Sequence, residues 1–133
     1  MNIIFAIYSI LIVSSVLVGF YYAFKQSKKI SDIEKGEIAI FEEQCGGWID
    51  NYRLTMPFVR HTLYEDFLIV TYIKTSHIVY FDDIAKIKIK NYFISKGITY
   101  YHDKNNTYKQ FTIFSKSTKK VIDILKEKNI IIE

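Results

Sequence analysis

The feature that most constrains this 133-residue chain is an apolar run near its N-terminus, at residues 3–24. The run holds no charged residue and no proline, and its polar side chains do not gather on one face. A helix of about 22 residues, rising about 1.5 Å per residue, crosses a hydrocarbon layer about 30 Å thick. A helix buried in a small soluble domain usually keeps a polar stripe, because so small a domain cannot surround it. The sequence therefore predicts a single transmembrane helix within residues 1–24.

The residues on either side of the run predict its orientation. Lys25, Lys28 and Lys29 follow it directly, whereas only Met1 and Asn2 precede it. A cleaved secretory signal would need a basic segment before the run and a small-residue cleavage site after it, and neither is present. Because basic loops remain in the cytoplasm, we expect an uncleaved anchor in the cell (inner) membrane. Its N-terminus would lie outside and the C-terminal domain in the cytoplasm.

Composition describes the rest of the chain. All acidic residues lie beyond the run, so the net charge of +4 comes mainly from the three lysines beside it, and the remaining domain is close to neutral. A near-neutral domain held at a membrane does not suit nucleic-acid binding. That domain is rich in Ile, Tyr, Phe and Thr, which favours strands, and it is long enough for one compact unit.

The segment after the run predicts a linker and then a less regular region. Residues 25–36 continue at helical spacing, which predicts a juxtamembrane helical linker. Residues 37–41 alternate as in a short strand, and residues 48–55 favour another strand. The Gly46-Gly47 pair between them is typical of a turn or a strand bulge. Whether this region belongs to the following domain or lies outside it as an extra hairpin stays open at this level.

Alternation of apolar and polar residues predicts six strands in the remainder of the chain. They cover residues 59–64, 67–72, 77–81, 84–90, 97–103 and 108–114. Glu65-Asp66 separates the first two as a tight hairpin turn, and a polar turn at residues 104–107 joins the last two. Such a series of short strands joined by turns is typical of antiparallel pairing.

An amphipathic helix is predicted at about residues 117–128. A serine can cap its start, and Val121, Ile122 and Leu125 form one apolar face. The three isoleucines at residues 130–132 are too apolar to remain in solvent. We therefore expect this tail to pack against the domain.

This order of short strands and one closing helix resembles a pleckstrin-homology-like (PH-like) domain, of the kind found in small bacterial membrane-anchored proteins. The residues that carry the resemblance are 57–70, 78–89, 97–101 and the helix at 121–125. The resemblance implies an α+β, mainly β fold, in which an antiparallel β-barrel over residues 37–133 is closed by the C-terminal helix. It also implies a binding scaffold rather than a catalyst. Phosphoinositide-binding members carry a strongly basic first hairpin, whereas this one combines Arg60 with Glu65 and Asp66.

Lysines provide the candidate binding residues. Alternating lysines and isoleucines at residues 86–90 place three ammonium groups on one face of a strand. The candidate contacts for an anion or a lipid headgroup are Lys25, Lys28, Lys29, Lys86, Lys88 and Lys90. Two plainer interpretations explain the same residues. The first three lysines fix the topology of the anchor, and the other three keep a strand face solvated and discourage edge pairing.

Residues typical of catalysis or metal binding do not form a recognised motif. The sequence contains no nucleophile elbow and no phosphate-cradling glycine loop, and the three histidines lack the spacing of metal ligands. The single cysteine, Cys45, is expected to be a small buried hydrophobe. We therefore expect no enzymatic activity, no cofactor, no metal and no small-molecule substrate.

These expectations describe a membrane-tethered, non-catalytic binding or scaffolding module at the cytoplasmic face. One face of its barrel would contact a neighbouring membrane protein, its expected partner, or the bilayer. The alternative is a structural or regulatory accessory subunit of a membrane complex that acts mainly through its transmembrane helix. Ser15 and Gly19 are small residues at a spacing that suits helix packing, which favours this alternative.

Overall fold

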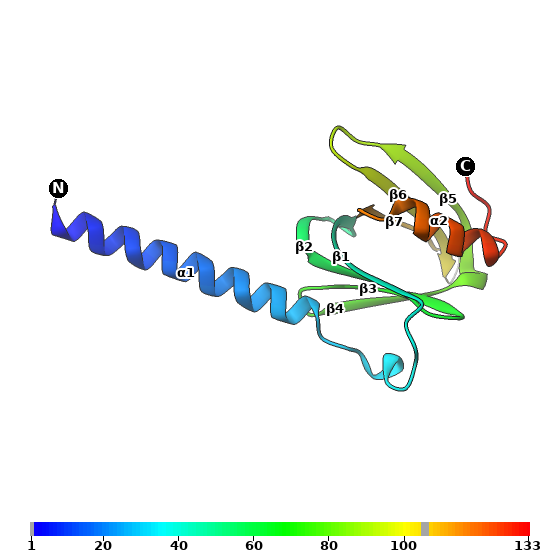
Figure 1. Cartoon of the computed structure of the whole chain (residues 1–133), viewed down its shortest axis with the longest axis horizontal. Helices are drawn as coiled ribbons and strands as arrows, with labels where there is room; N and C mark the ends of the chain where they lie inside the picture. Colours follow the sequence, from blue (N-terminus) through cyan, green and yellow to red (C-terminus); the bar gives the residue numbers. More distant parts are fainter. Residues whose placement is uncertain (1, 105–106) are drawn as a thin grey trace.

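The computed structural model describes residues 2–104 and 107–133 (Figure 1). The fold is α+β and mainly β: an apolar N-terminal helix, a seven-stranded antiparallel sheet curled into a half-barrel, and a C-terminal helix. This confirms the predicted order of one helix, a series of strands and a closing helix. The centre of the predicted turn at residues 104–107 lies outside the described residues.

Helix α1 (Ile3–Ser27) is long and apolar enough to cross a membrane. It extends three residues beyond the predicted end at residue 24. Most of its side chains are exposed, and the Ser9 and Ser14 hydroxyls donate to carbonyls one turn earlier. Such backbone partners allow serine in an apolar helix without an unsatisfied donor. Near its C-terminal end, α1 contacts the sheet through Phe20, whose ring lies edge-on to that of Phe58 at 4.7 Å.

The linker after α1 is not the continuous helix predicted for residues 25–36. The helix ends at Ser27, and only a short 3-10 turn follows, η1 (Asp32–Glu34). The reason is tertiary. The Glu34 carboxylate binds Arg60 of the sheet, and it also accepts a hydrogen bond from the backbone N–H of Ser31 at 2.6 Å. That bond replaces the helical spacing with a tight turn.

The sheet has the order β4-β3-β2-β1-β7-β6-β5. Its strands are β1 (Phe41–Ile49), β2 (Tyr52–Leu63), β3 (Phe67–Tyr72), β4 (Thr75–Tyr80), β5 (Ile84–Asn91), β6 (Lys96–Lys104) and β7 (Thr107–Ser115), with a 3-10 turn η2 (Phe81–Asp83) before β5. Two antiparallel meanders, β1–β4 and β5–β7, are therefore joined through β1 and β7. The two outer strands, β4 and β5, are not neighbours in this order. The sheet is thus an open half-barrel: the expected antiparallel, mainly β architecture with a closing helix is confirmed, and β4 and β5 do not pair to complete a barrel.

The region at residues 37–55 is partly inside the sheet. Residues 37–40 do not form the expected strand, and Ile38 is 87% exposed. The Ile40 N–H donates to the Leu63 carbonyl, but β2 ends at Leu63, which already pairs with Phe41, so the ladder does not extend further back. The expected strand at residues 48–55 is divided by a turn at Asp50 and Asn51. Asp50 has a φ of 54°, a conformation that aspartate tolerates better than most residues. The turn therefore converts one predicted strand into the β1–β2 hairpin.

The Gly46-Gly47 pair forms a bulge, one of the two predicted alternatives. The pairing of β1 with β2 shifts register between Cys45 and Gly47, and β1 also pairs with β7 here. A Cβ on Gly46 would lie 2.7 Å from the Leu54 carbonyl oxygen, and one on Gly47 would lie 2.8 Å from that of Thr112. Only glycine permits these approaches, so the pair allows one strand to bond to both halves of the sheet.

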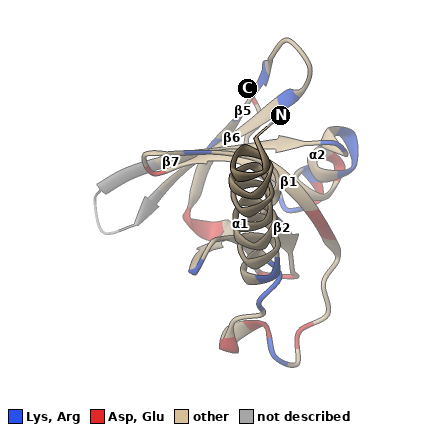
Figure 2. Ribbon diagram, turned by 90° about the vertical axis from the view of Figure 1, so that its left-hand side faces the viewer, with Lys and Arg blue, Asp and Glu red and all other residues tan. Residues whose placement is uncertain are grey.

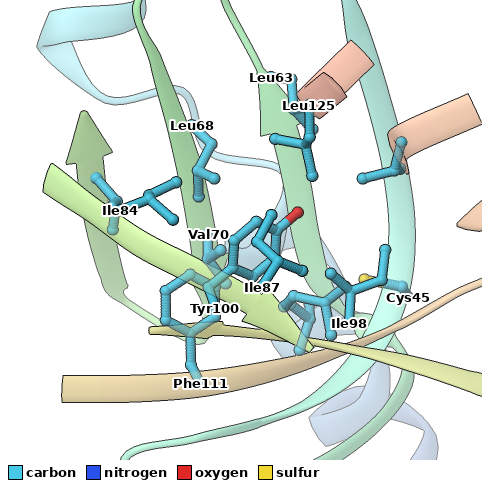
Figure 3. Packing of buried hydrophobic residues seen from close by; sticks show 14 of the residues in the cluster. Cys45, Leu63, Leu68, Val70, Ile84, Ile87, Ile98, Tyr100, Phe111 and Leu125 are labelled. Carbon is cyan, nitrogen blue, oxygen red and sulfur yellow. The ribbon is translucent and has the colours of Figure 1, made fainter. Parts of the chain in front are cut away.

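The hydrophobic core lies on the concave side of the sheet and is covered by α2 (Thr118–Glu127), close to the predicted helix at 117–128. Val121 and Leu125 of α2 are fully buried. Figure 3 shows core side chains from both meanders and from α2 converging, among them Leu63, Ile87 and Tyr100. The C-terminal tail then runs beside β5 through hydrogen bonds between its backbone and that of Ile87. As predicted, it packs on the domain through Ile130, but Ile131 is 63% exposed.

Candidate functional site

A wide groove opens at the end of the sheet where the β1–β2 and β5–β6 hairpins turn. It has a volume of about 1640 Å³ and is bounded by these two hairpins and by the junction of β7 with α2. Trp48, Met56 and Phe114 contribute apolar lining, and Phe93 and Ile94 project from the β5–β6 turn. Figure 1 shows both hairpin turns on the side of the domain from which α1 extends. The groove is therefore built at the end of the domain next to the apolar helix.

An aromatic cluster holds the β5–β6 hairpin against the groove. The ring of Tyr92 lies edge-on to those of Trp48 and Phe114, at 5.8 and 5.0 Å. A Cβ on Gly97 would lie 2.5 Å from the Tyr92 ring, so this glycine makes room for the tyrosine to fold back. The Arg53 guanidinium lies over the Trp48 ring, 4.3 Å from its centre, in a cation–π contact. These contacts give the groove a wall of packed side chains.

The charged side chains that line the groove are mostly basic. They are Arg53, Lys96, Lys116, Lys119 and Lys120, against the two acids Asp123 and Glu127. An apolar groove with an excess of cations suits a ligand that carries apolar groups together with negative charge. Among these residues, only the lysines around the start of α2 lie close together in the sequence. The groove itself is formed by three segments that are far apart in the chain.

Comparisons of this chain with models of protein families, with curated proteins and with solved structures find no match.

The structure places the predicted lysines of β5 next to the C-terminal residue. Lys86 and Lys88 have their ammonium groups 3.1 and 3.3 Å from the same Glu133 carboxylate oxygen. These two lysines hold the pKa of Glu133 below its usual value. An internal carboxylate thus occupies the place predicted for an external anion. Lys90, further along β5, is exposed beside the β5–β6 turn.

The predicted lysines at the end of α1 lie apart from those of β5. The α1 end contacts β2 and β3, whereas β5 is the opposite edge of the sheet. Lys25 is exposed in the last turn, and the Lys28 ammonium lies 4.2 Å from the centre of the Phe24 ring. Lys29 contributes its backbone carbonyl to a hydrogen bond from Arg60, at 3.3 Å. The six lysines therefore do not form one surface.

A buried ion pair that was not predicted from the sequence fixes the linker to the sheet. The Arg60 guanidinium donates to both carboxylate oxygens of Glu34, at 2.7 and 2.8 Å, and both side chains are at most 2% exposed. Tyr64 donates a third hydrogen bond to the same carboxylate, at 2.8 Å. Beside this pair, Ile33 packs on a small apolar cluster that includes Ile69. The available signal was the Ser-x-x-Glu spacing of residues 31–34, which is typical of a capping box.

The pKa of Glu34 makes this attachment sensitive to acid. Burial by itself raises the pKa, but the hydrogen bonds from Arg60, Ser31 and Tyr64 outweigh it and lower the pKa from 4.5 to about 2. A carboxyl with a lowered pKa stabilises the folded state above its unfolded pKa, and this contribution is lost as pH falls towards the folded value.

We therefore expect the advantage of the natural chain over Glu34→Gln to be constant above about pH 4.5 and to shrink as pH falls towards 2. The measurement is chemical unfolding of the full chain in detergent micelles, followed through Trp48, the only tryptophan. An advantage that does not change over this range would contradict the assignment.

A second polar group lies inside the half-barrel. His61 is fully buried, with Nδ1 3.2 Å from the Glu43 carboxylate and Nε2 3.0 Å from the Tyr100 hydroxyl. Cys45 is also buried, as predicted, and burial together with the nearby Glu43 raises the pKa of its thiol. A protonated, enclosed thiol behaves as a small hydrophobe. Within the described residues no three His, Cys, Asp or Glu side chains come together as metal ligands.

Proposed function

We propose that this protein is a membrane-tethered, PH-like binding module that holds a segment of a membrane protein in its groove at the cytoplasmic face. The observation that carries the proposal is the position of the groove. It opens on the side of the domain from which α1, the helix suited to cross the membrane, extends (Figure 1). The curled antiparallel sheet and the helix on its concave side support the PH-like assignment.

The chemistry of the groove supports a polypeptide segment as the ligand. Its apolar lining suits the apolar side chains of a bound segment, and its excess of basic side chains suits acidic residues on the same segment. Tethering both molecules to one membrane raises their effective concentration, so that even a weak contact in the groove suffices.

The test is photo-crosslinking in native membranes. A photoreactive amino acid replaces Met56, which lines the groove and is 49% exposed, or Ile38, which is 87% exposed in the linker and is not part of the groove lining. We expect adducts with a membrane protein from position 56 and few or none from position 38, because only the first faces the bound segment. Equal labelling at both positions, or no adduct at position 56, would refute the proposal.

A second candidate is an accessory subunit that acts through α1. One observation favours it: nothing lies within 4 Å of where a Cβ would stand on Gly19, so the face with Ser15 and Gly19 is open to another helix. A photoreactive residue at position 15 tests this candidate in the same membranes. Adducts from position 15 without adducts from position 56 would favour the helix over the groove.

A further inference from the structure

The turn between β5 and β6 presents two large apolar side chains to solvent. Phe93 and Ile94 are 104% and 92% exposed, more than any other large hydrophobic side chain of the described residues. Turns at this place in a hairpin are usually formed by small or polar residues, since they face water. The pair is also not needed for packing, because Tyr92 makes the contacts that hold the hairpin. Phe93 and Ile94 therefore require an apolar environment outside the domain.

The position of this turn indicates which environment is available. Figure 1 shows the β5–β6 turn on the side of the domain from which α1 extends. The domain is held firmly to α1, because Phe20 packs on Phe58 and the linker is fixed by the buried pair of Glu34 and Arg60. The turn is thus held towards whatever surrounds the apolar helix.

The charges beside the turn match a lipid surface. Lys90 and Lys96 flank the apolar pair, both are exposed, and no acidic residue lies between them in the sequence. Figure 2, seen with α1 towards the viewer, shows basic segments on both strands just before the turn. Apolar side chains at a tip with lysines behind them suit an anionic membrane interface, where rings and alkyl groups enter and ammonium groups meet headgroups. Phe93 and Ile94 also border the groove, so a bound polypeptide is the other environment that the test below separates from lipid.

We propose that the tip of the β5–β6 hairpin, Phe93 and Ile94, enters the interface of the membrane that α1 spans, with Lys90 and Lys96 against anionic headgroups. This inference rests on the membrane tether of the proposed function, and it does not depend on the groove ligand. The tip is then a second attachment to the bilayer. Together with α1 it fixes the rotation of the domain and holds the mouth of the groove at the membrane surface.

The test measures the depth of the tip in vesicles. One variant of the full chain carries Ile94→Cys, and the control carries Asp66→Cys in the exposed turn between β2 and β3. Each cysteine is labelled with an environment-sensitive fluorophore. The buried Cys45 is shielded from the label. Vesicles contain phosphatidylcholine alone or with phosphatidylglycerol, and brominated acyl chains serve as quenchers.

We expect severalfold stronger quenching at position 94 than at position 66, and stronger quenching with phosphatidylglycerol than without it. Phe93→Ser should remove most of the quenching at position 94, because it deletes half of the apolar tip. Lys90→Gln with Lys96→Gln should remove the dependence on phosphatidylglycerol, since each lysine near an anionic surface changes the attraction by about fivefold. All four side chains involved are exposed, so the variants should fold normally.

Equal quenching at positions 94 and 66 would overturn the inference. Quenching at position 94 that needs native membrane proteins, and is missing in pure lipid, would overturn it too, because the tip would then bind a protein. An alkaline wash of the same vesicles separates this failure from that of the tether. If the chain stays attached to the vesicles but its tip remains in water, only the inference about the tip is refuted. If the chain is washed off, the membrane tether and the inference are both refuted.

Discussion

Replacing Arg60 by alanine is expected to lower the free energy of unfolding by about 3–5 kcal/mol. The substitution leaves the Glu34 carboxylate, whose side chain is fully buried, without the guanidinium that compensates its charge. It also frees the linker, which Arg60 holds through the Lys29 carbonyl as well. The measurement is chemical unfolding of the full chain in detergent micelles, followed through the fluorescence of Trp48.

A matched double variant separates the loss of a partner from the value of the pair itself. In Glu34→Gln with Arg60→Met no buried charge remains, and the half-exposed Glu42, the other partner of Arg60, is solvated. The glutamine oxygen can accept the hydrogen bond of Ser31 while its NH2 group donates to the Tyr64 hydroxyl oxygen, because Ser31 and Tyr64 bond to different oxygens of Glu34. Replacing a whole buried ion pair by uncharged groups is often close to neutral, so we expect most of the stability to return. A loss in Arg60→Ala below about 1 kcal/mol, the value of an exposed pair, would contradict the role of Arg60.

Leu125→Ala is expected to lower the free energy of unfolding by about 2–5 kcal/mol, because it opens a cavity where α2 meets the concave face of the sheet. Leu125 is fully buried in the same cluster as Leu63 and Ile87, from opposite halves of the sheet. An open half-barrel depends on this helix, since β4 and β5 do not meet to enclose the core.

Lys126→Ala is the control for this prediction on the same helix. Lys126 is exposed, and alanine keeps the helix propensity, so the change should stay within about 0.5 kcal/mol. The same unfolding measurement applies to both variants. Similar effects of the two substitutions would show that α2 does not cover the core.

The elements that were predicted correctly have signals contained in short stretches of sequence. The hairpin of β2 and β3 is confirmed, with Leu63 paired to Leu68 around the Glu65-Asp66 turn. The closing helix is confirmed within a residue at each end. In each case the periodicity of apolar residues and the residues that end the element lie next to one another, so no distant contact is needed to recognise them.

The elements that were predicted wrongly are those in which a distant residue competes with a local preference. The helical spacing in the linker does not produce a helix, because Glu34 instead binds Arg60, 26 residues later in the sequence. The alternation at residues 37–41 yields no strand before Phe41, since the neighbouring strand β2 ends at Leu63, the partner of Phe41. A local pattern states a preference, and pairing decides whether it is realised.

The candidate site follows the same division. The lysines of β5 were recognisable as a stripe, yet Glu133, brought in by the tail, occupies two of them. The groove was not recognisable, because its walls come from the β1–β2 hairpin, the β5–β6 hairpin and the start of α2. No single stretch of sequence contains enough of these residues to indicate a common surface.

By itself, the sequence determined that the chain begins with an apolar helix of membrane length and continues as a mainly β domain with a closing helix. Those properties depend on composition and on the spacing of apolar residues, every two in a strand and every three or four in a helix. Both can be recognised within a short stretch of sequence. Only the tertiary structure decided that the sheet stays open, that Glu34 meets Arg60 and that Phe93 and Ile94 line the groove. It also decided that the β5–β6 turn lies on the side of the domain from which α1 extends (Figure 1). Each of these depends on contacts between residues far apart in the chain, and such contacts form only when burial and pairing across the whole domain are satisfied together.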